Sequence, residues 1–285
     1  MLFRSVNITD VYTFSPTSGA TCSGIPSGSI NSSTTYQYTC TVSVPRACVT
    51  LNNTATFTVT TADSDTDDTG NSSVAAKVCR IPASTGALTM GFWQNSNGQG
   101  LIKTYCNGTA LRTFLLSFAP FQDLSASASC TDIASYVSTK IGLANCGGAT
   151  CNAMLKAQDL ATTLDVFFTG PGWTGSKIGS VKPPSTFLPN SPLGNVQIDL
   201  TQICNMTDGS GGSGTCSGSF ATASSVFGGA PCLYVYNTGQ LTDILRYAAS
   251  QSDVGGTLWY ANNKANQVLA KNVFDAINNQ AAFTC

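Results

Sequence analysis

The most informative property of this sequence is what it lacks. Its 285 residues contain no histidine and no glutamate, so every acidic side chain is an aspartate. Without an imidazole, neither a Ser-His-Asp nor a Cys-His catalytic arrangement can form, and the commonest metal ligand is missing. Hydrolysis by paired carboxylates would need two aspartates, and the candidates are scattered along the chain: Asp123, Asp132, Asp159, Asp165, Asp199, Asp243 and Asp275. The composition therefore disfavours an enzyme.

Charge is also scarce. Charged residues make up 9% of the chain, against about a quarter in ordinary proteins, and the formal net charge is −1. Weak repulsion between copies favours self-association. The absence of a Lys/Arg cluster disfavours nucleic acid as a partner, because phosphate contacts need such a cluster. No apolar run approaches the roughly 20 residues of a membrane span, so we expect none.

Cysteine, in contrast, is abundant. The chain has 12 cysteines, an even number, and none of them forms a Cys-x-x-Cys pair typical of metal or redox sites. Disulfide bonds are the simplest interpretation, and they place the protein in an oxidising compartment, outside the cell or on its surface. The cysteines are Cys22, Cys40, Cys48, Cys79, Cys106, Cys130, Cys146, Cys151, Cys204, Cys216, Cys232 and Cys285.

Two further features concern secretion. Asn-x-Ser/Thr sequons permit glycosylation without establishing it, because a chain so rich in Asn, Ser and Thr contains such triplets by chance. The residues after Met1 lack the apolar segment of a signal peptide, so we expect a precursor that extends further toward the N-terminus. The candidate glycosylation sites are Asn7, Asn31, Asn52, Asn71, Asn107 and Asn205.

Residues 1–86 predict an antiparallel immunoglobulin-like β-sandwich domain. Apolar and polar residues alternate over 5–14, 34–44 and 51–61, and a further strand is expected at 74–78. Short strands separated by turn residues are typical of a sandwich.

The four cysteines of this domain allow three pairings, of which we expect Cys22–Cys40 and Cys48–Cys79. The domain is short for a complete sandwich. A missing strand would leave an open edge that a neighbouring chain could fill by strand addition.

One acidic segment is a candidate calcium site. Asp63, Asp65 and Asp67 alternate along the chain, the spacing with which a loop wraps oxygen ligands around Ca²⁺. The EF-hand pattern fails, because Asp68 stands where its glycine belongs and no bidentate glutamate comes after it. A solvated turn is the alternative interpretation.

The chain changes character over residues 88–102. Phe92 and Trp93 are expected to anchor the core of the domain that begins here, because aromatic side chains bury large areas. The run from Asn95 to Gly98 predicts a tight turn, since Asn and Gly tolerate left-handed backbone.

Residues 87–285 predict a mainly helical, disulfide-rich domain, so the expected fold class is α+β with two domains. The region 208–218 is expected to be a flexible Gly/Ser insertion. Cys146–Cys151 and Cys204–Cys216 are the expected local disulfides, and the other four cysteines would pair among themselves. Helical spacing of apolar residues is found at 99–106, 109–118, 132–141, 152–168, 240–250 and 263–279.

Residues 90–99 read Met-Gly-Phe-Trp-Gln-Asn-Ser-Asn-Gly-Gln. They resemble the Gly-Phe-Trp-Ser-Asn-Lys-Asn-Gly-Gln opening of a C-terminal module of large secreted surface proteins, which often carry Ig-like repeats of the DUF11 type upstream. Residues 259–283 are similar to the closing helix of that module, and 53–56 with the acidic segment after them resemble the end of a DUF11 repeat. The resemblance implies an extracellular location and this domain architecture, and it implies no activity.

These observations predict a non-catalytic extracellular structural protein, a subunit or C-terminal part of a cell-surface assembly or filament. Its partners would be copies of itself or other surface-protein subunits. The alternative is an adhesin-like module that binds glycan or another cell surface through aromatics such as Trp173, Phe187 and Trp259, unless these lie in the core or an interface. No cofactor is expected, calcium excepted.

Overall fold

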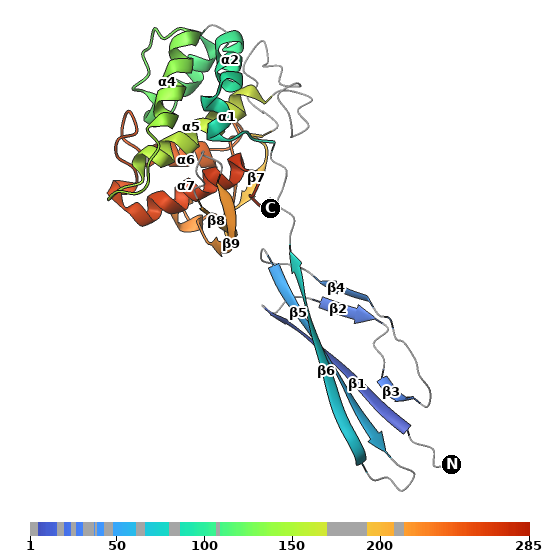
Figure 1. Cartoon of the computed structure of the whole chain (residues 1–285). Coiled ribbons are helices and arrows are strands. Elements are labelled where there is room, and N and C mark those ends of the chain that lie inside the picture. The colour runs from blue at the N-terminus through green and yellow to red at the C-terminus, as the bar shows by residue number, and fades with distance from the viewer. Residues whose placement is uncertain are drawn as a thin grey trace. The chain divides into compact units, whose positions relative to one another are not determined.

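The computed structural model is a mixed α+β structure with small antiparallel sheets. Contacts divide the chain into two compact units, Met1–Ile81 and Pro82–Cys285, close to the predicted boundary at residue 86 (Figure 1). The structure describes residues 5–15, 20–23, 27–30, 37, 39–42, 48–60, 66–79, 86–106, 109–169, 193–207 and 214–285.

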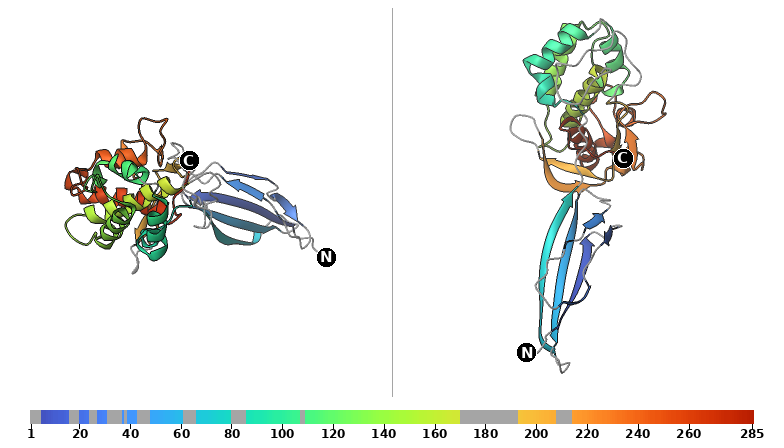
Figure 2. Two further views of the ribbon diagram at one scale, coloured as in Figure 1. Left: turned by 90° about the horizontal axis from the view of Figure 1, so that it is seen from above. Right: turned by 90° about the vertical axis from the view of Figure 1, so that its right-hand side faces the viewer.

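Three long strands dominate the first unit and run side by side in both views of Figure 2. The described strands form a four-stranded sheet of order β3-β1-β5-β6 and a two-stranded sheet, β2-β4, all of them antiparallel. β6 therefore ends the strand order of the larger sheet. The strands are β1 (Ser5–Ser15), β2 (Ala20–Ser23), β3 (Ser27–Ile30), β4 (Thr39–Val42), β5 (Cys48–Thr60) and β6 (Thr66–Cys79).

The two faces of the long sheet differ in polarity because side chains alternate along each strand. Leu51, Ala55, Phe57 and Val59 of β5 share one face, and the register places Val74 of β6 on the same face. The opposite face carries a row of threonine and asparagine positions from the same strands, and Thr54 and Ser73 share a hydrogen bond between their hydroxyls there. The strands predicted at 5–14 and 51–61 are confirmed.

The acidic segment differs from its prediction. Thr66 and Asp68, which flank Asp67 of the predicted calcium-binding segment, belong to β6, where they pair with Thr60 and Val59. A register shift at this point accommodates Asp67 as the extra residue of a bulge. The backbone pairing with β5 continues past the point at which the aspartates suggested that the strand had ended.

In the second unit, α5 and α7 pack against each other, and every α5 residue from Leu155 to Phe168 is buried. The smaller helices and four short strands surround this pair (Figure 1). The helices are α1 (Met90–Gln94), α2 (Ser96–Tyr105), α3 (Ala110–Leu116), α4 (Cys130–Gly142), α5 (Asn152–Phe168), α6 (Ile244–Ser250) and α7 (Lys264–Asn278), with the single turns η1 (Ala119–Phe121), η3 (Ser224–Phe227) and η4 (Tyr260–Asn262). The strands are β7 (Gln197–Asp199), β8 (Ile203–Thr207), β9 (Thr215–Ala221) and β10 (Cys232–Tyr234), paired as β7-β10 and β8-β9.

The predicted turn at Asn95–Gly98 is wrong. Asn95 lies between two helices with φ −77°, and its side-chain oxygen accepts hydrogen bonds from the backbone N–H of Asn97 and Gly98, so it caps α2. Glycine is needed at position 98 for a steric reason and not for a left-handed φ. A Cβ there would lie 2.3 Å from the carbonyl oxygen of Phe92.

The flexible insertion predicted at 208–218 is wrong in its last part. Thr215 to Gly218 belong to β9, where Cys216 pairs with Met206 of β8. The Gly/Ser composition suggested a loop, but the pairing with β8 and a disulfide to Cys204 hold this segment as a strand. The predicted helices 152–168 and 263–279 correspond to α5 and α7.

The second unit contains four disulfides. Cys146–Cys151 and Cys204–Cys216 are the two local pairs that the sequence analysis expected. The remaining four cysteines pair as Cys106–Cys130 and Cys232–Cys285.

In the first unit, the strand register places Cys22 directly opposite Cys40 and Cys48 directly opposite Cys79. Opposite Cα atoms of antiparallel strands lie about 4.5–5.5 Å apart, within the range that a disulfide needs. The expected bonds Cys22–Cys40 and Cys48–Cys79 stay predictions that this register supports.

Candidate functional site

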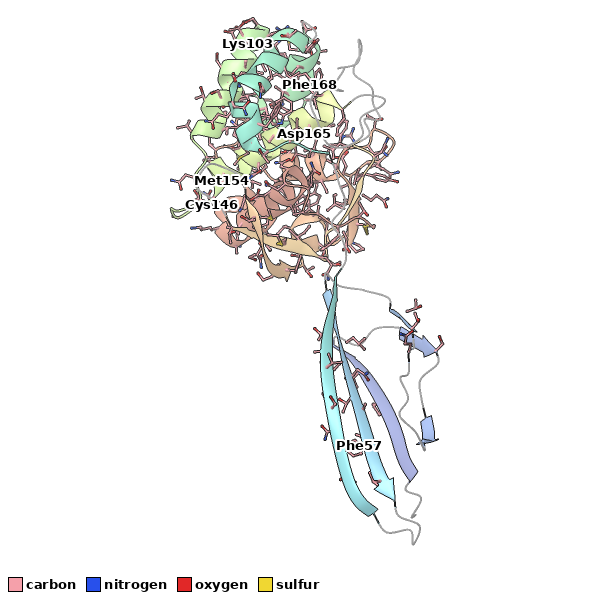
Figure 3. All side chains as sticks on the ribbon, turned by 45° about the vertical axis from the view of Figure 1, so that its right-hand side comes forward. Phe57, Lys103, Cys146, Met154, Asp165 and Phe168 are labelled. Atoms are coloured by element: carbon pink, nitrogen blue, oxygen red, sulfur yellow. A yellow bond between two sulfur atoms is a disulfide. The ribbon has the colours of Figure 1, made fainter. Side chains whose placement is uncertain are left out.

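Trp93 belongs to the buried core of the second unit. Thr89 caps α1, and the helix carries Trp93 to a position with 0% exposure. The indole ring stacks on Phe168 with centroids 5.3 Å apart, and its Nε1 donates a hydrogen bond of 3.1 Å to the carboxylate of Asp165. Figure 3 shows Asp165 and Phe168 inside the helical unit. Phe92, the other predicted anchor, is half-buried and packs edge-on against Trp93.

Two buried carboxyl groups lie along α5. Burial raises the pKa of Asp165 well above its ordinary value, although the hydrogen bond from Trp93 opposes this change. Burial also raises the pKa of Asp159, against hydrogen bonding from Thr163 and the charge of Lys156. Both groups belong to the buried core, where Asp165 accepts from Trp93 and the Thr163 hydroxyl lies 3.5 Å from the Asp159 carboxylate.

The raised pKa of Asp159 predicts a pH dependence of stability. The folded-state pKa of Asp159 lies above the ordinary 3.8, so the folded state binds the proton more tightly than the unfolded state does. The protonated carboxyl therefore stabilises the folded state at low pH, and this stabilisation is lost as pH rises through the folded pKa. Asp159→Asn has no such loss. We expect its Tm, relative to the parent chain, to rise as the pH is raised from 3.8.

A surface carboxyl of opposite behaviour provides the control. Hydrogen bonds from Ser129 lower the pKa of Asp132 in the capping box of α4. The ionised Asp132 therefore stabilises the fold above its ordinary pKa, and this stabilisation is lost as pH falls. The Tm of Asp132→Asn, relative to the parent, should therefore decrease as pH rises. Melting curves across a pH series measure both, and parallel curves for Asp159→Asn and the parent would contradict the prediction.

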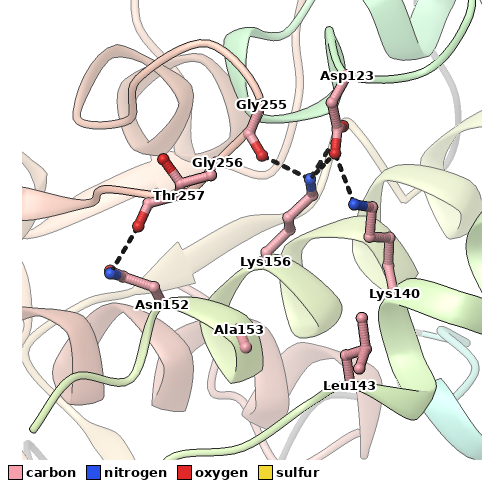
Figure 4. Close-up of a pocket in the computed structure, with 9 residues that line it drawn as sticks. All are labelled: Asp123, Lys140, Leu143, Asn152, Ala153, Lys156, Gly255, Gly256 and Thr257. Atoms are coloured by element: carbon pink, nitrogen blue, oxygen red, sulfur yellow. Dashed lines mark hydrogen bonds and ion pairs between the residues drawn. The ribbon is translucent and has the colours of Figure 1, made fainter.

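A pocket of about 250 Å³ opens where α4 and α5 meet the loop after α6. Lys156, buried on α5, donates to both carboxylate oxygens of Asp123 at 3.0 and 2.9 Å and to the carbonyl of Gly255 at 2.7 Å (Figure 4). Lys140 of α4 lies 2.6 Å from the same carboxylate, and the Tyr136 hydroxyl donates to it at 2.6 Å.

The electrostatics of this cluster follow from burial and pairing. Burial would raise the pKa of Asp123, but hydrogen bonds from Lys140, Tyr136 and Lys156 lower it below its ordinary value. Burial lowers the pKa of Lys156, and the neighbouring Asp123 opposes that change. Burial and the negative charge of Asp123 both raise the pKa of Tyr136. The Asp123 carboxylate is thus held ionised between two lysines.

The loop that closes the pocket has an unusual backbone. Gly255 and Gly256 have positive φ, and so do three consecutive non-glycine residues, Tyr260, Ala261 and Asn262. Left-handed backbone costs about 1–2 kcal/mol per such residue, so surrounding contacts must hold the loop in place. Asn152 supplies several of them, since its amide donates to the Thr257 carbonyl and accepts from the Trp259 N–H.

The polar side chains of the pocket are therefore occupied by the chain's own groups. Lys156 and Asn152 fasten the loop to α5, which is a structural task. Leu143, which lines the pocket, is 63% exposed. Val254 and Leu258 are next in sequence to the lining residues Gly255 and Thr257, and they are 67% and 41% exposed. Sequence reasoning did not identify this site. One signal was present, a lysine at position 156 within the apolar pattern of α5, four residues after Asn152.

A second candidate surface is the outer edge of β6. This strand has 14 residues, and the described part of the sheet places β5 on one side of it and no strand on the other. Every residue from Asn71 to Ala75 is exposed, so both faces of the strand are open there, and Val74 is 64% exposed.

Phe57 of β5 lies next to this edge on the same face as Val74, and it is 38% exposed (Figure 3). Its ring covers Gly70 of β6, because a Cβ on that glycine would lie 2.4 Å from the ring. An exposed edge with large apolar side chains is a site at which another chain can pair.

The predicted site residues have different outcomes. Asp63 and Asp65 of the calcium candidate lie outside the described residues, and Asp67 lies in β6. Within the described ranges no three His, Cys, Asp or Glu residues are grouped to hold a metal ion. Trp259 has 0% exposure and belongs to the core, whereas Trp173 and Phe187 lie outside the described residues.

The sequons are distributed over both units. Asn52 and Asn71 are exposed on β5 and β6, and Asn7 lies on β1. Asn205 of β8 is half-buried, and its amide donates to Ser219 at 3.0 Å. Asn31 and Asn107 lie outside the described residues.

Comparison with protein-family models, with curated proteins and with solved structures gives no match. Among the described helices, none is long and apolar enough to cross a membrane. The disulfides of the second unit are consistent with an extracellular protein. The function is therefore inferred from the chain's own surfaces.

Proposed function

We propose that this chain is a non-catalytic extracellular structural protein, a subunit of a cell-surface assembly. The observation that carries the proposal is the edge of β6, where Asn71 to Ala75 are exposed and Val74 and Phe57 present apolar side chains. Monomeric proteins normally protect such edges with charges, prolines or a covering segment, and the stretch from Asn71 to Ala75 contains no charge and no proline. An edge left open over this length suits a chain that pairs with another chain.

The rest of the molecule supports the same function. We propose that the first unit is an immunoglobulin-like sandwich that is completed by a strand from a neighbouring subunit. The second unit has a large core with four disulfides, which stabilise a fold outside the cell. A formal net charge of −1 leaves little repulsion between assembled copies.

Electron microscopy of the purified, oxidised chain tests this proposal. We expect regular oligomers or polymers that disappear when Val74 and Phe57 are both replaced by serine. Particles that stay monomeric at every concentration, together with no polymer in material from the native cell surface, would contradict it.

A second function is favoured by the pocket at Lys156. Leu143 is exposed at the pocket, and Val254 and Leu258 are exposed beside two of its lining residues in the sequence. An adhesin-like module could present such apolar side chains to glycan or to another cell surface. A glycan array separates the two functions, because binding by a soluble monomer that Leu143→Asp abolishes would favour adhesion.

A further inference from the structure

We propose that β6 pairs with β6 of a second copy of this chain, antiparallel and centred on Ser72. This inference rests on the proposed function and specifies its partner and register. A twofold axis perpendicular to the sheet keeps the apolar faces of the two copies on the same side. Residues that lie opposite each other in the two copies must then share a face. Side chains alternate along the strand, so the numbers of two such residues are both even or both odd and add up to an even number. When Ser72 lies opposite its own copy, this sum is 144 for every pair.

Apolar contact favours this register. With Ser72 opposite its own copy, Val74 of one chain lies opposite Gly70 of the other. Gly70 has no side chain of its own, and the ring of Phe57 from the neighbouring strand covers it. The pairing therefore brings exposed Val74 of one copy against exposed Phe57 of the other, and symmetry repeats the contact. Cross-strand pairs of an aromatic and a β-branched residue stabilise sheets.

Charge favours the same register. The strand carries one lysine, Lys77, and two aspartates, Asp67 and Asp68. With Ser72 at the centre, position 77 of one copy lies opposite position 67 of the other, with Asp68 beside it at the bulge. In this register, the position of the only lysine in β6 lies opposite the acidic end of the partner's strand. Centring on Ser73 instead would place Lys77 opposite Thr69 and Val74 opposite Ser72, and both complementary contacts would be lost.

An interface of this kind closes on itself, because each copy uses the same edge. The expected unit is a dimer with one continuous sheet through both copies. A filament built from such dimers needs another contact elsewhere on the chain.

Sedimentation equilibrium of the full oxidised chain measures the dimer dissociation constant. We expect Val74→Ser to raise it about tenfold, since two symmetric contacts are lost. The matched control is Val11→Ser, which removes a valine that is 53% exposed, from β1 and from the opposite face of the same sheet. The control should leave the dissociation constant unchanged, and equal effects of the two substitutions would overturn the register.

A charge exchange tests the register independently. Lys77→Asp alone should weaken the dimer about tenfold through like charges, and Asp67→Lys in the same chain should restore it. Circular dichroism identifies any variant that does not fold. Association that is insensitive to these changes would overturn the β6 pairing and leave the proposed assembly function standing. A parent chain that never associates, together with no polymer in material from the native cell surface, would overturn both.

Discussion

Replacing Trp93 with alanine is expected to lower the free energy of unfolding of the second unit by about 3–5 kcal/mol, the range for large buried aromatics. The side chain has 0% exposure and stacks on Phe168, so its removal leaves a cavity between α1 and α5. The change also removes the hydrogen bond that Asp165 accepts from the indole, which leaves a buried carboxyl with one partner fewer.

Trp93→Phe and Phe92→Ala are the matched controls for this prediction. Trp93→Phe keeps an aromatic ring against Phe168 and loses the hydrogen bond, so about 1–2 kcal/mol is expected. Phe92 is half-buried, and Phe92→Ala should cost less than Trp93→Ala. Chemical denaturation followed by far-ultraviolet circular dichroism reports the helices of this unit. A cost for Trp93→Ala no larger than that for Phe92→Ala would show that Trp93 is not the anchor.

Removing the disulfide Cys232–Cys285, by changing both cysteines to alanine, is expected to cost about 4 kcal/mol. The bond joins residues separated by 53 positions, and the loss of chain entropy in the unfolded state grows with loop length. The bond also fastens the last residue to β10, beside the backbone hydrogen bond from the Cys285 N–H to the Gln197 carbonyl.

The control is the disulfide Cys146–Cys151, which closes a separation of only 5 positions. Its removal should cost about 2 kcal/mol on the same relation. Thermal and denaturant unfolding of the two double variants, each compared with the parent chain, measures the difference. Equal costs would show that strain or native contacts, and not loop length, determine what these bonds contribute.

The sequence predicted the elements whose pattern reflects burial. The helical spacing of apolar residues over 152–168 predicted α5 with its observed bounds. The long strands β1 and β5 were visible in their alternation of apolar and polar residues. Cys146 and Cys151 were paired correctly because their short separation leaves few alternatives.

The errors arose where a tertiary contact overrides a local preference. Asn95 and Gly98 are residue types typical of turns. In the structure Asn95 caps α2, and Gly98 allows the backbone of α2 to approach Phe92 of α1 closely. Thr215–Gly218 looks like a flexible insertion until β8 supplies its partner strand. The cluster of Asp123, Tyr136, Lys140 and Lys156 combines three segments, and no local pattern in the sequence connects them.

The bond between Cys232 and Cys285 has a mechanical consequence for the second unit. Tension applied at Cys285 passes through the sulfur bridge directly to Cys232. The intervening residues, which include α6 and α7, are thereby bypassed by the load and cannot be unravelled from that end while the bridge is intact. In the oxidised protein, pulling at Cys285 would instead load the chain at Cys232 in β10. Once the bridge is reduced, the residues between the two cysteines can also unfold under load, so the protein should extend further by the length of that segment.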